Sequence, residues 1–338
     1  TGSDTVQYFQ IRKSRGSSEQ FHGAVIDHIG TNDTRVFKEV ASLGADLTKV
    51  SEITGTLSGN KVAIIFDWDN RWAIDDAWAL SNETKNFDKT CMEIYNEFMS
   101  LGVECDIISS DMDWSKYSVI VAPMLYVLHD HVGEKIASFV RNGGQFMSTY
   151  FTGYVDKSLL TWLGGFPGDG LSEVFGLRSE EIDTLYPEDK VSIKVLDKAG
   201  ITSRQVDVFD YQELLRDVTA TILCKYSNDY MAGTPAITRN AYGNGQAYYV
   251  ACRTKQSDIE FIYREMLENA KVPYTKLPVG IEKHSRYSDE YRYDFYLNTT
   301  DKEISLEDIS GYDILGESVI DNKLVLSGYG VAIIKNEL

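Results

Sequence analysis

A regular alternation of short apolar runs and amphipathic segments, which begins at Lys61, constrains the fold of this chain more than any other feature. Apolar runs of strand length occupy residues 61–66, 103–109, 117–123 and 145–151. Between them, residues 82–102 and 130–144 carry apolar side chains at helical spacing, and each segment ends at glycine. Strands and helices that alternate with short connections predict a parallel sheet with helices on both faces.

The later part of this region departs from simple alternation. Residues 220–226 and 236–252 read as strands, and the second run folds into a hairpin at Gly243-Asn244-Gly245. A closing helix follows at 257–270, where Ser257 and Glu260 have the spacing of a capping box. The predicted class is therefore α/β, with a flavodoxin-like (glutamine-amidotransferase-like) domain over residues 61–275.

The two flanking regions have other patterns. Residues 6–12 predict a buried strand, 16–28 a Gly/Ser-containing loop, and 33–53 a long helix capped by Asp33 or Thr34. One such β/α unit cannot bury its own apolar face, so residues 1–55 must belong to something larger. Residues 55–60 read as a linker, and residues 278–338 predict a small antiparallel β-domain. Its tyrosines favour cross-strand packing over sugar binding (Tyr287, Tyr291, Tyr293 and Tyr296).

The amino-acid composition limits the classes of molecule that this chain is expected to bind. The net charge of -18 disfavours nucleic acid and anionic membranes, and no apolar run approaches the ~20 residues of a membrane helix. The four cysteines have no zinc-site or disulfide spacing, so we expect free thiols in a cytoplasmic protein, with no metal and no cofactor. No signal peptide is visible, and the chain starts almost directly in a strand, which predicts a piece of a longer protein.

The sequence of the predicted 61–275 domain disfavours both nucleotide binding and amidotransferase catalysis. The loop after its first strand holds Asp67 and Asp69, which would repel a phosphate, so nucleotide binding is disfavoured. An amidotransferase needs a cysteine or serine on a strand-to-helix elbow with a histidine in reach. The candidate elbow STYFTGYVD offers the hydroxyls of Ser148, Thr149 and Thr152. It has no cysteine and no histidine nearby in the sequence. His129 and His131 lie at a helix start, where partial solvation is the common role.

By elimination, this domain is predicted to be a scaffold or an interface. The aromatic-rich loop Phe66–Trp78 carries Trp68, Trp72 and Trp78 beside charged residues. Such tryptophans are typical of contact surfaces between subunits, and ordinary core packing is the alternative.

The stretch VQYFQIRKSRGSSEQFHGAVIDH (residues 6–28) resembles the last barrel strand and following loop of the glycoside hydrolase family 42 β-galactosidases. The similarity continues through DTRVFKEVASLGADL, KVAIIFDWDNRWA, YSVIVAPMLYVLHD and GGQFMSTYFTGYVD to the closing YGVAIIK, and so spans essentially the whole chain. Gln20 and Ile11 depart from the family pattern, which often has Lys and Trp there.

The resemblance implies three parts: the last strand, loop and helix of a truncated (β/α)8 catalytic barrel (1–55), a trimerisation domain (61–275) and a C-terminal β-domain (278–338). It also implies that Glu19 and His22 hydrogen-bond galactose hydroxyls and that Phe9 lines the sugar pocket, while Arg12 supports the loop through an ion pair. Retaining hydrolysis needs two carboxylates about 5–5.5 Å apart. In the family both are glutamates on earlier barrel strands, so no catalytic residue is assigned here.

The preferred interpretation is a non-catalytic fragment of a β-galactosidase that assembles a homotrimer. The complete enzyme would hydrolyse terminal β-D-galactosides with retention, and the chain alone would be inactive. One alternative is a stand-alone carbohydrate-binding or regulatory scaffold that has lost the barrel. A third reading, an amidotransferase-like hydrolase, is disfavoured by the missing elbow residues.

Overall fold

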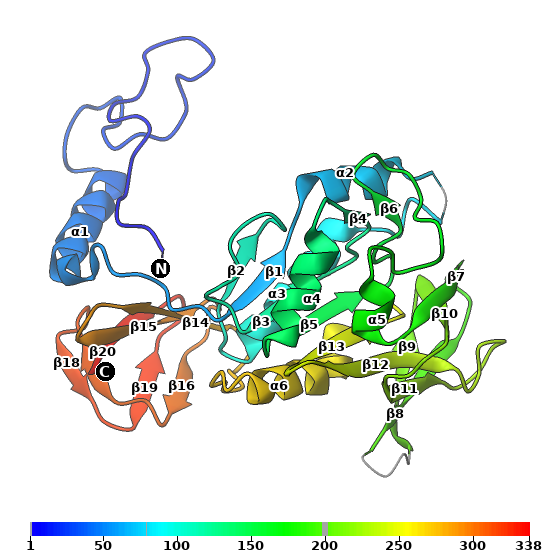
Figure 1. Ribbon diagram of the computed structural model, residues 1–338. Coiled ribbons are helices and arrows are strands. Elements are labelled where there is room, and N and C mark those ends of the chain that lie inside the picture. Colours follow the sequence, from blue (N-terminus) through cyan, green and yellow to red (C-terminus); the bar gives the residue numbers. More distant parts are fainter. Residues whose placement is uncertain (1, 79, 198–201) are drawn as a thin grey trace. The chain divides into compact units, whose positions relative to one another are not determined.

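The computed structural model describes residues 2–78, 80–197 and 202–338, and the chain divides into two compact units. Unit 1 combines residues 1–59 with residues 277–338, and unit 2 spans residues 60–276 (Figure 1). Residues from both ends of the chain therefore build one unit. The sequence had predicted two separate domains there, residues 1–55 and 278–338.

Unit 2 is built on a nine-stranded mixed sheet. Five parallel strands form one half, in the spatial order β2 (Cys105–Ile108), β1 (Val62–Ile65), β3 (Val119–Ala122), β5 (Gln145–Thr149) and β13 (Gly245–Val250). Antiparallel strands continue the sheet as β12 (Pro235–Tyr242), β11 (Thr221–Tyr226), β8 (Val191–Leu196) and β9 (Thr202–Val208). The predicted α/β class is confirmed, and the sheet is mixed rather than wholly parallel.

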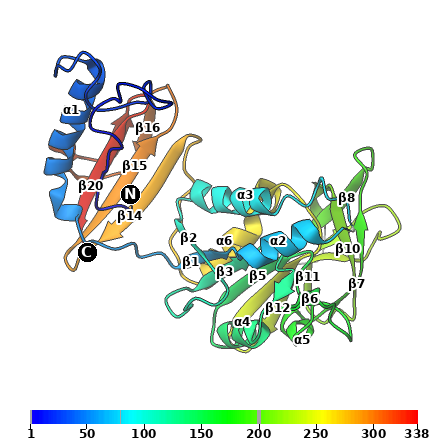
Figure 2. The ribbon, with the colours of Figure 1, turned by 90° about the horizontal axis from the view of Figure 1, so that it is seen from above.

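Helices cover both faces of the parallel half of the sheet (Figure 2). This agrees with its strands β1, β3 and β5, which are buried at every position and so face a core on both sides. On one face, α3 (Phe87–Ser100) and α6 (Glu260–Asn269) share a core with Val62 and Ile64 of β1. On the other, α4 (Val132–Arg141) and α5 (Leu171–Phe175) share a core with Ala63 and Ile65. Alternate residues of β1 thus enter two separate cores.

Smaller elements complete unit 2. They are α2 (Trp68–Asp76), the 3-10 turn η2 (Gln256–Ile259) and two strand pairs, β4 (Val127–Leu128) with β6 (Val155–Asp156) and β7 (Arg178–Thr184) with β10 (Tyr211–Arg216). The hairpin predicted at Gly243-Asn244-Gly245 joins β12 to β13, with Tyr242 opposite Gly245. The capping box predicted at Ser257 and Glu260 is wrong, because η2 precedes α6 and no side chain caps that helix.

Unit 1 holds the antiparallel β-domain. Its five-stranded sheet has the order β14 (Ile281–Tyr287), β15 (Tyr291–Asn298), β20 (Val331–Glu337), β17 (Gly311–Asp313) and β18 (Ser318–Ile320), and β16 (Ile304–Glu307) pairs with β19 (Lys323–Leu326). Tyr293 and Tyr296 are buried, which confirms packing as their role.

The N-terminal segment of unit 1 contains α1 (Arg35–Lys49) and the 3-10 turn η1 (Ser51–Ile53). Thr34 caps α1 through a bond from the Phe37 amide, as predicted. Val50 packs among Tyr293, Phe295 and Ile333 of the sheet. The strand predicted at residues 6–12 is reduced to one bridge between Arg12 and Ile26. A barrel strand needs hydrogen-bonded neighbours on both sides, and among the described residues the backbone hydrogen bonds of residues 10–13 go to residues 25 and 26 alone.

Candidate functional site

Glu19 and His22 lie together on a surface turn of unit 1. The His22 amide donates to the Glu19 carbonyl at 3.0 Å, so a single turn brings the two residues together. Gln10 Nε2 donates to Glu19 Oε2 at 3.0 Å, which orients the carboxylate. Both side chains are otherwise exposed. This surface turn therefore carries a carboxylate and an imidazole three residues apart, in the blue N-terminal part of Figure 1.

The surroundings of Phe9 are open rather than pocket-like. Phe9 is 80% exposed, and Ile11 and Phe21 are exposed to a similar degree. Among the described residues Lys13 forms an ion pair with Asp27 at 2.7 Å, and Arg12 contributes a backbone bridge to Ile26. The ion pair expected of Arg12 stays a prediction. An apolar side chain this exposed needs further chain to cover it before it can line a sugar pocket.

The tryptophan segment is a helix rather than the predicted loop. Residues 68–76 form α2, and the exposed fractions of Trp68, Trp72 and Trp78 are 59%, 58% and 89% in the described chain. The rings of Trp68 and Trp72 lie 5.9 Å apart. Core packing is therefore wrong for these three residues. Trp68 and Trp72 are neighbours on α2 and Trp78 is exposed just beyond its end, and we call the three side chains together the tryptophan surface.

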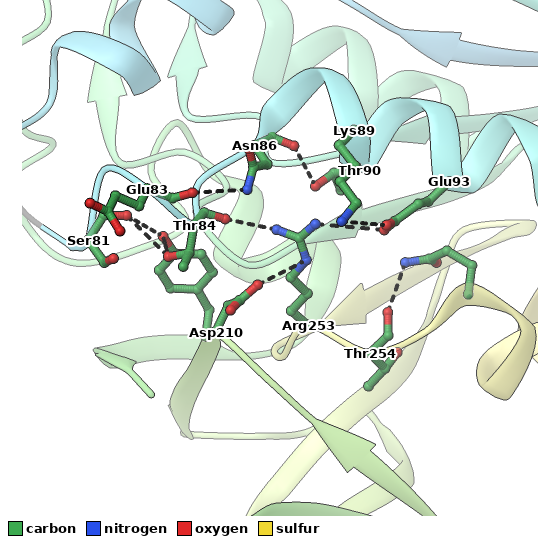
Figure 3. Close-up of polar contacts among 12 residues, drawn as sticks. Ser81, Glu83, Thr84, Asn86, Lys89, Thr90, Glu93, Asp210, Arg253 and Thr254 are labelled. Atoms are coloured by element: carbon green, nitrogen blue, oxygen red, sulfur yellow. Dashed lines mark hydrogen bonds and ion pairs between the residues drawn. The ribbon is translucent and has the colours of Figure 1, made fainter. Parts of the chain in front are cut away.

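A buried arginine holds the segment that follows Trp78 (Figure 3). Arg253, just beyond the end of β13, is 2% exposed and donates to the Thr84 carbonyl at 2.9 Å. Its guanidinium also lies 3.5 Å from Asp210 and 3.7 Å from Glu93. Strand β13, helix α3 and the 80–86 segment are thereby tied to one cation.

Lys85 performs a related task at the end of α2. Its ammonium is buried and donates to the carbonyls of Ile74 and Ala77, which belong to the last turn and the C-cap of the helix. Burial lowers the pKa of Lys85 below its ordinary value. The tryptophan surface is thus supported from within by two buried cations, which sequence reasoning missed because neither belongs to a recognisable motif.

The candidate elbow is a packed turn and not a nucleophile site. Ser148 and Thr152 are fully buried and hydrogen-bond each other at 2.6 Å, while Ser148 also donates to the Ala122 carbonyl. Thr149 Oγ1 accepts from the Met124 amide at 2.8 Å. Because these hydroxyls are engaged in internal bonds, the structure supports the prediction against an amidotransferase.

A buried carboxyl lies against the same turn. Glu213 of β10 is completely buried and accepts from the Phe151 amide (3.0 Å), Tyr154 Oη (3.1 Å) and Tyr249 Oη (2.7 Å). Burial raises the pKa of Glu213 to about 7, against the lowering effect of these donors. Sequence offered no signal for this residue, because its donors come from two distant segments, the turn at residues 151–154 and strand β13.

Two features, a metal-ligand cluster and a membrane-spanning helix, are absent from the residues that the structure describes. No group of three or more His, Cys, Asp or Glu side chains is placed there to hold a metal ion. Within the same ranges, no helix has both the length and the apolar character that crossing a bilayer requires.

Comparison with known proteins decides the family. The profile described as "Beta-galactosidase trimerisation domain" matches residues 60–273, and the profile described as "Beta-galactosidase" matches residues 1–50. The chain belongs to the glycoside hydrolase family 42 β-galactosidases. It corresponds to their C-terminal portion, as the sequence predicted, and contains their trimerisation domain.

Relatives support the assignment along the whole chain. Beta-galactosidase Pbg of Clostridium perfringens is 39% identical over 343 residues, covering 99% of this chain and 50% of that protein. Beta-galactosidase GanA of Bacillus subtilis is 34% identical over 340 residues, with 99% and 49% covered. The chain spans about half the length of the curated relatives it matches.

Solved structures of family 42 enzymes have the same fold. The β-galactosidase Gan42B of G. stearothermophilus superposes with a TM-score of 0.92 at 36% identity, covering 100% of this chain and 49% of that one. The β-galactosidase of Bacillus circulans sp. alkalophilus gives a TM-score of 0.92 at 34% identity, with 99% and 50% covered.

Proposed function

We propose that this chain is the assembly portion of a β-galactosidase and holds three copies together as a homotrimer. The observation that carries the proposal is the match of residues 60–273 to a domain described as one of trimerisation. The tryptophan surface supports it, because Trp68, Trp72 and Trp78 are large, rigid and exposed in the single chain. Aromatic side chains of this kind are enriched at the centres of subunit interfaces.

The fold of the assembly domain belongs to the same proposal. Numbered along the chain, the parallel strands β2, β1, β3, β5 and β13 lie in the order 2-1-3-4-5, which supports a flavodoxin-like description. The proposed division keeps residues 1–55 as the end of a catalytic barrel, 61–275 as the trimerisation domain and 278–338 as the β-domain. Residues 1–55 and the β-domain lie in one compact unit, and Val50 packs on the sheet of the β-domain.

For the complete enzyme we propose retaining hydrolysis of terminal β-D-galactosides, with Glu19, His22 and Phe9 as substrate ligands. The Glu19 carboxylate can accept bonds from neighbouring hydroxyls, and His22 lies one turn away to bind a further hydroxyl. The chain alone is inactive in this proposal, because the pair of catalytic carboxylates would come from the rest of the barrel. A cytoplasmic location belongs to it as well, and the four buried free cysteines are typical of a reducing compartment.

Dilution tests the assembly role. Trp68, Trp72 and Trp78 would leave water when three copies associate, so the tryptophan emission should move to longer wavelength as the protein is diluted and the trimer dissociates. A Trp72→Ala, Trp78→Ala variant keeps Trp68, the buried Trp114 and the half-buried Trp162; because it should not associate, its emission should show no such movement. Emission of the native chain that stays at the exposed-tryptophan wavelength at every concentration would contradict the proposal.

Hydrolysis is assayed separately, with a chromogenic β-galactoside. We expect no turnover by the purified chain. Turnover that co-elutes with the chain and disappears in a Glu19→Gln variant would contradict the assignment of the catalytic pair to the missing barrel strands.

A further inference from the structure

One buried arginine of the β-domain binds both ends of the N-terminal segment of unit 1. Arg286 of β14 is 4% exposed, and its Nη2 donates to the Asp4 carboxylate at 2.8 Å and to the Thr56 carbonyl. Its Nη1 donates to the Ser3 carbonyl at 3.4 Å. The planar guanidinium carries five N–H donors in a fixed arrangement, so a single side chain can join these distant residues. The chain before and the chain after the β/α unit therefore meet at one cation.

Further bonds tie the same two ends together. Asp4 Oδ2 accepts from the Gly55 amide at 3.2 Å, while its Oδ1 accepts from Arg286. The hydrogen bond from Arg286 lowers the pKa of the Asp4 carboxyl below its ordinary value. Leu57 and Tyr287 exchange backbone hydrogen bonds of 3.1 and 2.8 Å, which places Leu57 against β14, an edge strand of the sheet. Both ends of the segment thus lie against the edge of the β-domain.

A second attachment holds the end of helix α1. Glu52 of η1 accepts from Tyr293 Oη at 3.1 Å and from the Lys335 ammonium. Val50, one residue beyond α1, is buried on the same sheet. Because Tyr293 lies on β15 and Lys335 on β20, this attachment uses inner strands of the sheet, whereas Arg286 uses its edge.

The chain between these attachments has little support of its own within unit 1. Helix α1 contains no buried residue, and Phe9, Phe21 and Leu43 are exposed. Ordering one residue costs ~1–2 kcal/mol of conformational entropy, which exposed side chains do not offset. The direction of this β/α unit, and of the turn that carries Glu19 and His22, is therefore set by its two ends.

We propose that the C-terminal β-domain has a function of its own: it is a clasp that holds residues 4–57 at both ends, through Arg286 and Glu52, and fixes the direction in which the turn of Glu19 and His22 projects. The clasp acts within one copy of unit 1, so it goes beyond the proposed function and requires neither trimer assembly nor hydrolysis. Only its consequence for substrate binding rests on the proposed role of Glu19 and His22 as ligands.

Distances between pairs of spin labels, measured by pulsed electron paramagnetic resonance on the full chain, test the clasp. One pair joins Ala45→Cys, at an exposed position of α1, to Val319→Cys on β18. A reference pair joins Lys302→Cys to Val319→Cys within the β-domain. The four native cysteines are buried, so the labels attach to the introduced thiols. Labelled chains are diluted into an excess of unlabelled ones, so that only distances within one copy are recorded.

The native chain should give a narrow distance distribution for both pairs. Arg286→Ala should broaden the distribution of the α1 pair about twofold or more and leave the reference pair unchanged, because it releases residues 3–4 and 56 from the β-domain. Asp4→Ala should broaden the same pair and add little to Arg286→Ala, since both remove one contact. Glu52→Gln weakens the separate attachment and should add to Arg286→Ala. Lys323→Ala, an exposed cation of β19, is the control and should change neither pair.

Three results would overturn the proposal. They are a native α1 pair already as broad as that of Arg286→Ala, a narrow α1 pair in the Arg286→Ala, Glu52→Gln variant, and equal broadening of both pairs in Asp4→Ala and in Arg286→Ala. The last would show a general loss of structure rather than release of one segment. Asp4→Ala changes a side chain that is 40% exposed and lies outside the β-domain, so it keeps the test decisive if Arg286→Ala does not fold. Trimer assembly and sugar binding do not enter the measurement, so their failure is distinguished from failure of the clasp.

Discussion

Glu213 should make the stability of unit 2 fall as the pH rises. Its carboxyl is fully buried with no cation bonded to it, and burial raises its pKa from the ordinary 4.5 to about 7. Below pH 4.5 the carboxyl is protonated in both the folded and the unfolded chain, so it imposes no penalty. Between 4.5 and 7 the unfolded chain ionises while the folded chain stays protonated, and the folded state loses stability throughout this window.

The magnitude follows from the shift. A difference of 2.5 in pKa corresponds to about 3.4 kcal/mol of unfolding free energy over the whole window, and roughly 2.5 kcal/mol of it falls between pH 5 and pH 8. Glu213→Gln retains an acceptor at Oε1 for the Phe151 amide and the Tyr154 hydroxyl, turns an amide donor toward the Tyr249 oxygen, and cannot ionise. The advantage of the variant over the native chain should therefore grow by about 2.5 kcal/mol from pH 5 to pH 8.

Urea unfolding at one fixed protein concentration, followed by circular dichroism, measures this difference. Subtracting the unfolding free energy of the variant from that of the native chain at each pH cancels the contributions of the other titrating groups. Glu188→Gln is the matched control, because Glu188 is exposed and should give the same difference at both pH values. A Glu213→Gln difference that is also equal at pH 5 and pH 8 would refute the reasoning.

Three other expectations concern particular contacts. Arg253→Ala should lower the unfolding free energy of unit 2 by about 3 kcal/mol, because Asp210 and Glu93 lose their buried counter-ion; a loss no larger than that of the half-exposed Arg216→Ala would contradict this. Val50→Ala should destabilise unit 1 by about 2 kcal/mol and leave unit 2 unchanged in urea unfolding, since Val50 packs on the sheet of unit 1; the exposed Val319→Ala is its control. A thiol reagent should label no cysteine in the native chain and four in urea, because burial both covers these thiols and raises their pKa (Cys91, Cys105, Cys224 and Cys252). Fast labelling of any one of them in the native protein would show that its part of the core is open.

The parallel half of the sheet was predictable because its signal is local. The predicted strand at 61–66 became β1, and the predicted helix at 130–144 became α4, with ends a few residues inside the predicted ones. Apolar periodicity and terminal glycines suffice for such elements. The turn at Gly243-Asn244 was predictable for the same reason.

The parts that failed depend on distant segments. The strand expected at residues 6–12 requires barrel neighbours to complete its hydrogen bonds, so its apolar, aromatic composition misled the prediction. The segment after β1 was read as a loop because tryptophans and aspartates alternate there. It forms α2, and Lys85 caps its end by bonding carbonyls eight and eleven residues upstream. Most of the antiparallel strands between 178 and 226 were missed; β7 pairs with β10, and β8 with β11, across connections that contain other strands.

The residues of the candidate site stay predictions from the sequence, and their surroundings could not be predicted from it. Family motifs singled out Glu19 and His22, and the structure brings them into one turn. Arg253 and Glu213 carry no motif, because each acts through contacts with segments more than 30 residues away. Burial and pairing of single charged residues therefore had to come from the fold.

The solution mass of the native chain, measured by light scattering behind a sizing column, tests the central claim most directly. The account predicts three times the 38.1 kDa of one chain, and a lower mass for the Trp72→Ala, Trp78→Ala variant. A mass of 38.1 kDa at every concentration would contradict the claim that this portion of the enzyme assembles the trimer.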